Sequence, residues 1–125
     1  MYDGLHATLT EQILKCAIEV HRHLGPGLLE SVYETALCFE FTATGLTFRR
    51  QIGVPLYYKG QLLSEHRPDL VVADSVIVEV KAIEHLDRIH TAQMLTYLRV
   101  TGLHVGLILN FNSDTLRQGI RRVIL

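Results

Sequence analysis

The chain has 125 residues, of which 48% are hydrophobic and 20% charged, and its formal net charge is −1. This composition is typical of a compact globular protein and excludes disordered, collagen-like and low-complexity classes, while the length favours a single domain over residues 1–125. The near-zero charge also excludes a global positive field that would attract nucleic acid or an anionic membrane.

Two helices are predicted at the start of the chain. Apolar residues recur at helical spacing over residues 10–24, with Thr10 as the N-cap, and Gly25-Pro26 ends this helix. A second helix is predicted over residues 28–44, and Gly45 ends it. The chain therefore begins with a pair of helices joined by a short turn.

Strands are predicted next. Residues 46–63 are rich in Val, Ile, Tyr and Phe around Lys59-Gly60, which predicts strands joined by a hairpin. Two further strands are predicted over residues 68–73 and 76–82, and a short turn at Asp74-Ser75 separates them.

The rest of the chain returns to a helix and then to a strand. A long helix is predicted over residues 84–101, followed by a strand over 104–111 that is apolar enough to be covered on both faces. A short helix and a terminal strand are predicted within residues 113–125. This order predicts an α/β fold of the mixed α+β kind, in which helices flank a mixed sheet.

The strongest chemical signal is Glu79-Val80-Lys81. Alternate residues of a strand point to the same face, so Glu79 and Lys81 hold a carboxylate and an ammonium side by side. A solvated surface pair would show the same spacing, but the surrounding residues are apolar on both faces, which favours a buried strand. Glu79 and Lys81 are therefore candidate catalytic residues.

The position of Asp69 depends on the loop between its strand and the next. A two-residue turn at Asp74-Ser75 would place Leu70 opposite Glu79 and point Asp69 away. A three-residue loop or a bulge would place Asp69 opposite Glu79 or Lys81, and we predict this second arrangement. Two carboxylates and a lysine would then suit a hard divalent cation such as Mg²⁺.

Glu30 lies on the edge of the apolar stripe of the second helix, and Glu34 is expected further out. The helix dipole alone would favour a Glu in the first turn, so a purely structural role stays open. The stripe consists of Leu29, Val32, Tyr33, Ala36 and Leu37.

Gln93 and Tyr97 project from one stripe of the third helix. A buried amide needs a hydrogen-bond partner, and here the backbone, a phosphate or the carboxylates could supply it. The seven histidines show no recognised zinc spacing. The sequence also shows no phosphate-binding glycine loop, no serine-nucleophile elbow and no convincing Cys/His pair for nucleophilic catalysis. Enzyme classes that depend on those motifs lose support.

Together these residues resemble a known family. The segment Gly27-Leu28-Leu29-Glu30-Ser31-Val32-Tyr33 resembles the signature of the GxxExxY proteins. Asp69, Glu79-Val80-Lys81 and the Gln93 to Tyr97 pattern resemble the active-site motifs of the PD-(D/E)XK nuclease superfamily, in which the GxxExxY proteins are placed. The resemblance spans nearly the whole chain.

The resemblance implies a restriction-endonuclease-like core with a mixed sheet of about four strands and an added β-hairpin. It also implies that Asp69 and Glu79 bind Mg²⁺ or Mn²⁺, that Glu30 completes the acidic cluster, and that Lys81 orients or activates the attacking water. By the same resemblance, Gln93 and Tyr97 help to hold the metal site and the nucleic-acid backbone.

The function expected from this resemblance is divalent-metal-dependent hydrolysis of phosphodiester bonds in nucleic acid, with DNA favoured over RNA. A catalytically silent module that binds nucleic acid or a partner protein is the alternative, because the chain lacks the net positive charge that phosphate binding normally uses. Arg49, Arg50 and Arg67 are candidate nucleic-acid contacts if the fold gathers them; otherwise they are ordinary solvated charges.

Three further expectations concern location and assembly. Cys16 and Cys38 read as buried thiols in a reducing compartment, so we expect a cytoplasmic protein. No apolar run is long enough for a membrane span, and the residues from Met1 to Gly4 lack the features of a signal peptide. Val123-Ile124-Leu125 could form a last strand or an apolar patch for a second copy of the chain, and both options stay open.

Overall fold

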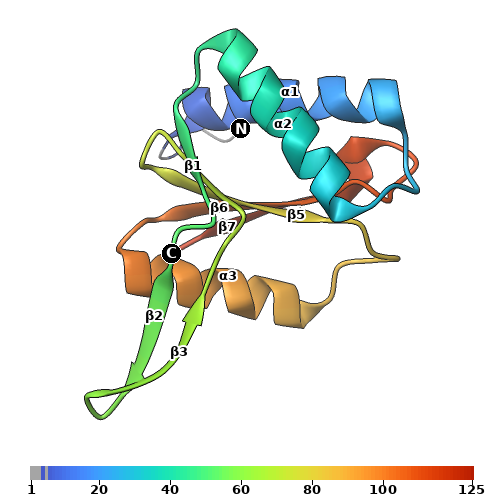
Figure 1. Ribbon diagram of the computed structural model, residues 1–125. Helices are drawn as coiled ribbons and strands as arrows, with labels where there is room; N and C mark the ends of the chain where they lie inside the picture. Colours follow the sequence, from blue (N-terminus) through green and yellow to red (C-terminus); the bar gives the residue numbers. More distant parts are fainter. Residues whose placement is uncertain (1–3, 5) are drawn as a thin grey trace.

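The structure is a computed structural model that describes Gly4 and residues 6–125. A five-stranded mixed sheet forms its middle layer (Figure 1). In spatial order the strands are β1 (Phe48–Arg50), β4 (Leu70–Val72), β5 (Val76–Lys81), β6 (Val105–Asn110) and β7 (Ile120–Ile124). β5 and β6 run parallel, and the other neighbouring strands of this sheet run antiparallel.

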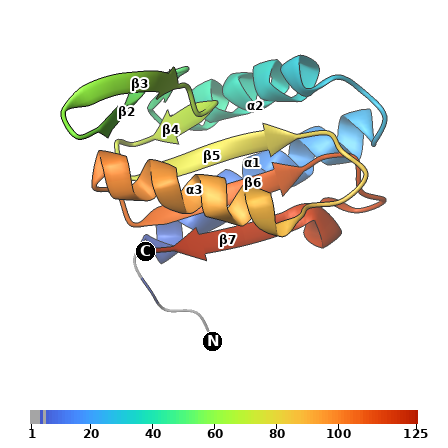
Figure 2. The ribbon, with the colours of Figure 1, turned by 90° about the horizontal axis from the view of Figure 1, so that it is seen from below.

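Helices cover both faces of the sheet. α1 (Ala7–Leu24) and α2 (Glu30–Thr44) lie on one face, and α3 (Arg88–Thr101) lies on the other (Figure 1, Figure 2). A short 3-10 helix, η1 (Leu116–Gly119), precedes β7. The predicted fold class, a restriction-endonuclease-like core of mixed α+β type, is confirmed.

β5 is buried on both faces, as its apolar sequence predicts. Val76, Val78 and Val80 belong to the core beneath α1 and α2, whereas Ile77 belongs to the core beneath α3. Because side chains alternate along a strand, Glu79 shares the α3 side with Ile77. The polar residues of this strand are therefore directed toward α3.

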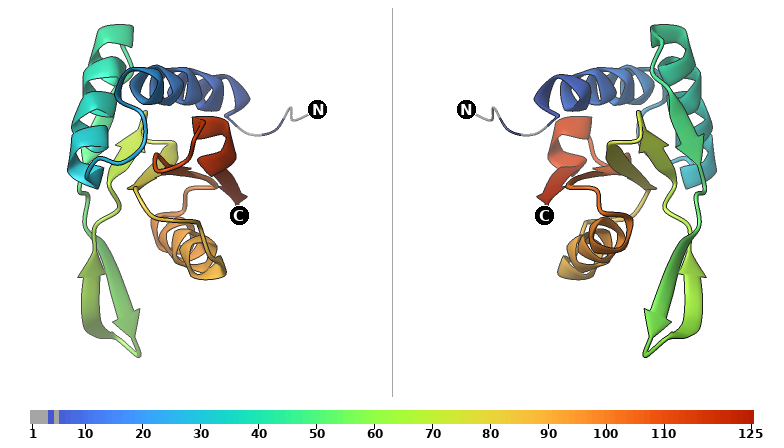
Figure 3. Two further views of the ribbon diagram at one scale, coloured as in Figure 1. Left: turned by 90° about the vertical axis from the view of Figure 1, so that its right-hand side faces the viewer. Right: turned by 90° about the vertical axis from the view of Figure 1, so that its left-hand side faces the viewer.

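The predicted hairpin projects from the sheet as a separate arm (Figure 3). It consists of β2 (Val54–Tyr58) and β3 (Gln61–His66), which pair antiparallel. The turn Lys59-Gly60 has backbone φ angles of 48° and 81°, the left-handed values that a tight hairpin turn requires. The arm leaves the sheet after β1 and returns to it at β4.

Several boundaries differ from the prediction. The sheet has one more strand than expected, because the three residues of β1 pair with β4. α1 begins at Ala7, one turn before the predicted start, and α2 begins at Glu30. α3 begins at Arg88 rather than near residue 84, because the His90 ring accepts the Asp87 N–H and fixes the start of the helix there.

Two compositional expectations concern the described residues. Cys16 and Cys38 are both free and buried. No helix in the part of the chain that the structure describes has the length and apolarity of a membrane span. Met1–Asp3 and Leu5, on which the expectation about a signal peptide mostly rests, lie outside the described residues.

The end of the chain forms β7, which ends at Ile124. Ile124 and the following Leu125 are exposed.

Candidate active site

The loop between β4 and β5 brings Asp69 and Glu79 together. Val72 pairs with Val76, so the loop consists of the three residues 73–75. Continuing this antiparallel register by one residue beyond β4 places Asp69 opposite Glu79. The predicted odd-numbered loop is therefore confirmed, and both carboxylates lie on one face of the sheet.

Backbone N–H groups of the opposite segment fix both carboxylates. The Asp69 N–H donates to Glu79 Oε1 at 2.7 Å, and the Val80 N–H donates to Asp69 Oδ2 at 2.7 Å. Lys81 Nζ lies 3.7 Å from Glu79 Oε2. The fold thus places two carboxylates and one ammonium at the same point on the sheet.

Burial changes the acidity of both carboxylates. Glu79 is 7% exposed, and desolvation, followed by the negative charge of Asp69, raises its pKa to about 7. Desolvation also raises the pKa of Asp69 to about 6, with contributions from the charge and hydrogen bonding of Glu34. Two partly buried carboxylates that resist ionisation near neutral pH are typical of functional sites.

α3 contributes Tyr97 to the same site. Tyr97 is buried, and desolvation together with the charges of Glu79 and Asp69 raises its pKa to about 12, so its hydroxyl remains protonated and can donate a hydrogen bond. Gln93 is half-buried one turn earlier, and its side chain takes part in none of the side-chain hydrogen bonds found among the described residues. Its contact with a phosphate therefore stays a prediction.

Glu30 reaches the same strand from the opposite side of the sheet. Its Oε2 accepts the N–H of Ala82, the residue after β5, at 3.1 Å. The buried Tyr33 hydroxyl donates to the Gly25 carbonyl at 2.5 Å and accepts the Leu28 N–H at 3.1 Å. Tyr33 thus fixes the loop before α2 and, with it, the place where Glu30 leaves the helix.

The expectation for Glu34 is wrong. Glu34 is 8% exposed, and its Oε2 accepts hydrogen bonds from Arg50 Nε at 3.0 Å and Nη2 at 2.8 Å. α2 is rotated relative to the predicted stripe, so that Leu29 is 75% and Val32 41% exposed. Helical periodicity missed this because the partner of Glu34 lies on a strand 16 residues further along the chain.

The three candidate nucleic-acid contacts, Arg49, Arg50 and Arg67, are all paired with acidic side chains. Arg49 and Arg50 are neighbours on β1 and point to opposite faces. Each arginine is already in an ion pair, Arg49 with Asp74 at 2.6 Å, Arg50 with Glu34 at 2.8 Å and Arg67 with Glu65 at 2.6 Å. Arg67 also donates to the carbonyl of Gln51, the residue after Arg50, at 3.0 Å. Contact with nucleic acid by any of the three stays a prediction.

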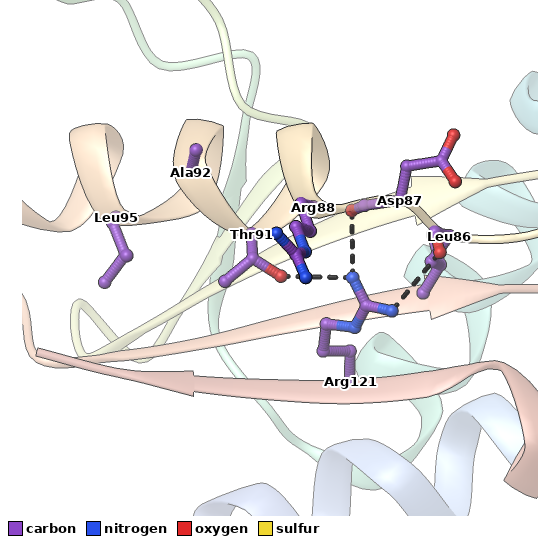
Figure 4. Close-up of a pocket in the computed structure, with 7 residues that line it drawn as sticks. All are labelled: Leu86, Asp87, Arg88, Thr91, Ala92, Leu95 and Arg121. Atoms are coloured by element: carbon purple, nitrogen blue, oxygen red, sulfur yellow. Dashed lines mark hydrogen bonds between the residues drawn. The ribbon is translucent and has the colours of Figure 1, made fainter.

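Another arginine of the chain has a structural role. Arg121 of β7 donates to the Asp87 carbonyl at 2.9 Å, to Thr91 Oγ1 at 3.1 Å and to the Leu86 carbonyl at 3.3 Å (Figure 4). These bonds tie β7 to the start of α3 beside a hollow of about 590 Å³. None of the candidate catalytic residues lines this hollow.

Sequence reasoning missed two supporting residues. Gln51 Nε2 donates to Asp69 Oδ1 at 3.4 Å, and no sequence signal pointed to it. The buried Asn110 accepts the Ile83 N–H and donates to the Ile83 carbonyl, which fixes the chain just after β5. Here a signal existed, because Asn110 is a polar residue in an otherwise apolar strand.

The donor set of the site fits a hard divalent cation. Among residues 4 and 6–125 no three His, Cys, Asp or Glu side chains are arranged to hold a metal ion. Mg²⁺, however, is commonly held by one or two carboxylates while water and phosphate oxygens complete its shell. Asp69 and Glu79 provide such a pair, and a cation would offset both the desolvation and the negative charge of Asp69 that raise the pKa of Glu79.

Comparison with known proteins agrees with this geometry. Residues 7–123 match the model of the PD-(D/E)XK nuclease superfamily. No curated protein and no solved structure matched the chain. The match covers nearly the whole chain and includes Asp69, Glu79 and Lys81. The chain therefore belongs to the PD-(D/E)XK nuclease superfamily.

Proposed function

We propose that this protein hydrolyses phosphodiester bonds in nucleic acid, with Mg²⁺ or Mn²⁺ bound by Asp69 and Glu79. Its superfamily indicates nuclease activity, and members usually use divalent metals. The observation that carries the proposal is the register of β4 and β5, which sets Asp69 opposite Glu79 with Lys81 Nζ 3.7 Å from the Glu79 carboxylate.

Each carboxylate has a defined task. Asp69 and Glu79 would hold the cation, and Glu30, fixed against Ala82 at the end of β5, would complete the acidic cluster. When bound, the cation supplies an acidic water and stabilises negative charge on the scissile phosphate. No covalent intermediate with the protein is needed.

The remaining residues act on the substrate side of the site. Lys81 Nζ lies beside the carboxylates, 3.7 Å from Glu79 Oε2, where it can orient the attacking water and attract the phosphate. Tyr97 stays protonated because its pKa is about 12, so it donates a hydrogen bond to a phosphate oxygen. Gln93, one turn earlier on α3, offers two further N–H donors on the same side.

The finer assignment to the GxxExxY group is part of the proposal. Gly27 has a φ of 102°, a value that favours glycine, and it lies in the loop that Tyr33 closes. Glu30 reaches the end of β5. Each of the three residues of the signature therefore has a physical task in placing or supplying the third carboxylate.

The decisive test is cleavage of single- and double-stranded DNA and RNA in Mg²⁺, Mn²⁺ or EDTA. We expect metal-dependent cutting, with DNA cut in preference to RNA, and a loss of at least about a hundredfold in Glu79→Gln and Lys81→Ala. Glu11→Gln and Lys15→Ala are matched controls on the exposed face of α1 and should cut like wild type.

The alternative function has its own signature in this experiment. If no substrate is cut but Mn²⁺ binding requires Asp69 and Glu79, the site holds metal without hydrolysing these substrates, and the catalytic proposal is wrong. If Mn²⁺ does not bind either, the fold serves as a binding module.

A further inference from the structure

The β2–β3 arm starts beside the candidate active site. β3 ends at His66, three residues before Asp69. At this base of the arm the His66 ring lies near the Tyr97 ring, with 6.1 Å between the two ring centroids. The arm extends from the sheet on the α3 side, which is also the side of Glu79 (Figure 1, Figure 3). A substrate held at the carboxylates therefore lies next to the arm.

The two faces of the arm carry different side chains. Val54, at the base, belongs to the core beneath α3, and side chains alternate along a strand, so Tyr58 points to the same side as Val54. Cross-strand partners share a face. The face on the side of the site, called the site face below, consists of Val54, Leu56, Tyr58, Gln61, Ser64 and His66. The opposite face consists of Pro55, Tyr57, Leu62 and Glu65.

An aromatic ring and a cation meet at the outer end of the site face. Tyr58 is 59% exposed, and Lys59 Nζ lies 5.3 Å from the centroid of its ring. An exposed ring offers a surface on which an unpaired base can stack, and a cation beside it attracts the phosphate backbone. This pairing of an aromatic side chain with a cation is typical of surfaces that bind a single strand.

The remaining polar groups of the arm favour the same ligand. Gln61, Ser64 and His66 give the site face side chains that can donate hydrogen bonds. The one acidic residue among residues 54–66 is Glu65, which lies on the opposite face and pairs with Arg67 at 2.6 Å. The site face thus carries no carboxylate that would repel a phosphate, although the chain as a whole has a formal net charge of −1.

We propose that the site face holds a single strand of nucleic acid beside the carboxylates, with an unpaired base stacked on Tyr58 and the phosphate backbone near Lys59. The inference rests on the proposed function, because it specifies the substrate of that site as nucleic acid with an unpaired strand. A base inside a duplex is already stacked and paired, so it cannot make this contact without being extruded. From His66 to Gln61 the arm spans roughly 17 Å, so the contact lies beyond the bond that is cut.

Two neighbouring tyrosines provide a matched pair of variants. Tyr58 and Tyr57 are 59% and 64% exposed and lie on opposite faces of the arm. Fluorescence anisotropy in EDTA, with a labelled single strand of thymidine nucleotides, measures binding without metal-dependent cutting. Tyr58→Ala should weaken this binding by about tenfold, whereas Tyr58→Phe, which keeps the ring, and Tyr57→Ala should stay within about twofold of wild type. Binding of a blunt duplex should change by less than about twofold in all three variants.

The role of Lys59 has its own measurement. Lys59→Gln should make the dependence of the logarithm of single-strand affinity on the logarithm of salt concentration shallower by about 0.7, the contribution of one phosphate contact. Lys15→Gln is the matched control, because Lys15 is exposed on α1. The control should leave the slope unchanged, and equal slopes in the two variants would contradict the contact between Lys59 and the backbone.

Other occupants of the arm predict different results. If a second copy of the chain covers the arm, Tyr57→Ala or Tyr58→Ala will shift the oligomeric state in analytical ultracentrifugation and leave single-strand binding unchanged, which overturns the inference. Equal weakening by Tyr57→Ala and Tyr58→Ala, or weakening of duplex and single-strand binding alike, overturns it too. Urea unfolding checks that each variant is folded.

Cleavage in Mg²⁺ separates this inference from the proposed function. Tyr58→Ala should raise the KM for single-stranded DNA by about tenfold and leave kcat within about twofold, because the stacking contact is the same in substrate and transition state. If wild type cuts DNA and Tyr58→Ala binds and cuts in the same way, the proposed function survives and the role of the arm is wrong. If wild type binds a single strand through Tyr58 but cuts no substrate, the proposed function is wrong and the binding role of the arm stands.

Discussion

Asp69 and Glu79 are held in a conformation that disfavours their charged forms. Glu79 is buried and Asp69 is partly buried, and the charge of Asp69 acts on Glu79 across the β4–β5 register. Two backbone N–H groups partly offset this effect, because each donates to one of the carboxylates. Without a cation, the site therefore takes up protons near neutral pH.

This acidity predicts how the metal-free protein responds to pH. The two pKa values rise from 3.8 and 4.5 to about 6 and about 7 on folding. As pH increases from 4 to 7, these two carboxyl groups ionise in the unfolded chain before they ionise in the folded protein. Their contribution to stability is therefore fully present at low pH and is lost as pH rises through the folded pKa values. In urea unfolding with EDTA, the free energy of unfolding should fall by an amount on the order of 1–3 kcal/mol between pH 4.5 and 8 because of these two groups.

The variants Asp69→Asn and Glu79→Gln isolate this effect from the other titrating groups. Each substitution should make the free energy of unfolding depend less on pH than it does in wild type. The double variant should lose the contribution of both carboxyl groups. Saturating Mn²⁺ should restore stability at pH 8, because it binds the folded state alone. An unchanged pH profile in both variants would mean that the carboxylates are not buried as described.

At the scale of secondary structure, the loop between β4 and β5 determines whether the site exists. Ala73 and Asp74 adopt left-handed backbone conformations, with φ angles of 51° and 52°. This conformation costs roughly 1–2 kcal/mol for a residue with a Cβ, yet it produces the three-residue loop that sets the register. The strained residues thus lie in the loop whose length sets the register. A loop one residue longer or shorter would turn Asp69 away from Glu79.

Replacing Ala73 by glycine should therefore stabilise the protein by up to about 1 kcal/mol, since relief of the left-handed strain exceeds the added flexibility of the unfolded chain. Ala92→Gly is the matched control. Ala92 is exposed within α3, where the same substitution should destabilise by about 1 kcal/mol. Urea unfolding measures both, and destabilisation of similar size in the two variants would contradict the description of the loop.

Sequence patterns predicted the elements better than they predicted the environment of single side chains. The buried strand β5 and the hairpin turn at Lys59-Gly60 follow from local residue types. The odd-numbered loop does not, because the residues also allow a two-residue turn; the loop is predicted from the chemistry it creates, since it brings Asp69 to Glu79. The rotation of α2 does not follow from local residue types, because it depends on the ion pair between the buried Glu34 and Arg50 of β1. Helical periodicity counts apolar residues, and it cannot anticipate a charged residue that the tertiary fold provides with a partner.

At the scale of the whole molecule, the charge distribution limits how nucleic acid can bind. The formal net charge is −1, and Arg49, Arg50, Arg67 and Arg121 are held by protein groups. These four of the twelve Lys and Arg residues are thus less available to replace counterions on a phosphate backbone. Binding should depend on contacts at the site more than on long-range attraction.

The salt dependence of nucleic-acid binding checks this expectation. In EDTA, the logarithm of the association constant should fall with the logarithm of salt concentration with a slope of about −3 or shallower, since each phosphate contact contributes roughly −0.9. Fluorescence anisotropy with a labelled duplex measures the slope. A slope steeper than about −6 would reveal an extended basic surface and would contradict the description of the arginines.

Anomalous diffraction from crystals of the protein grown with Mn²⁺ shows whether Asp69 and Glu79 bind a cation, because it locates the cation without reference to activity. We expect one manganese peak bound by carboxylate oxygens of both Asp69 and Glu79, and we expect this peak to be lost in crystals of Glu79→Gln. Manganese bound elsewhere on the molecule, or none at these two residues, would contradict the claim that they form the metal site of a nuclease.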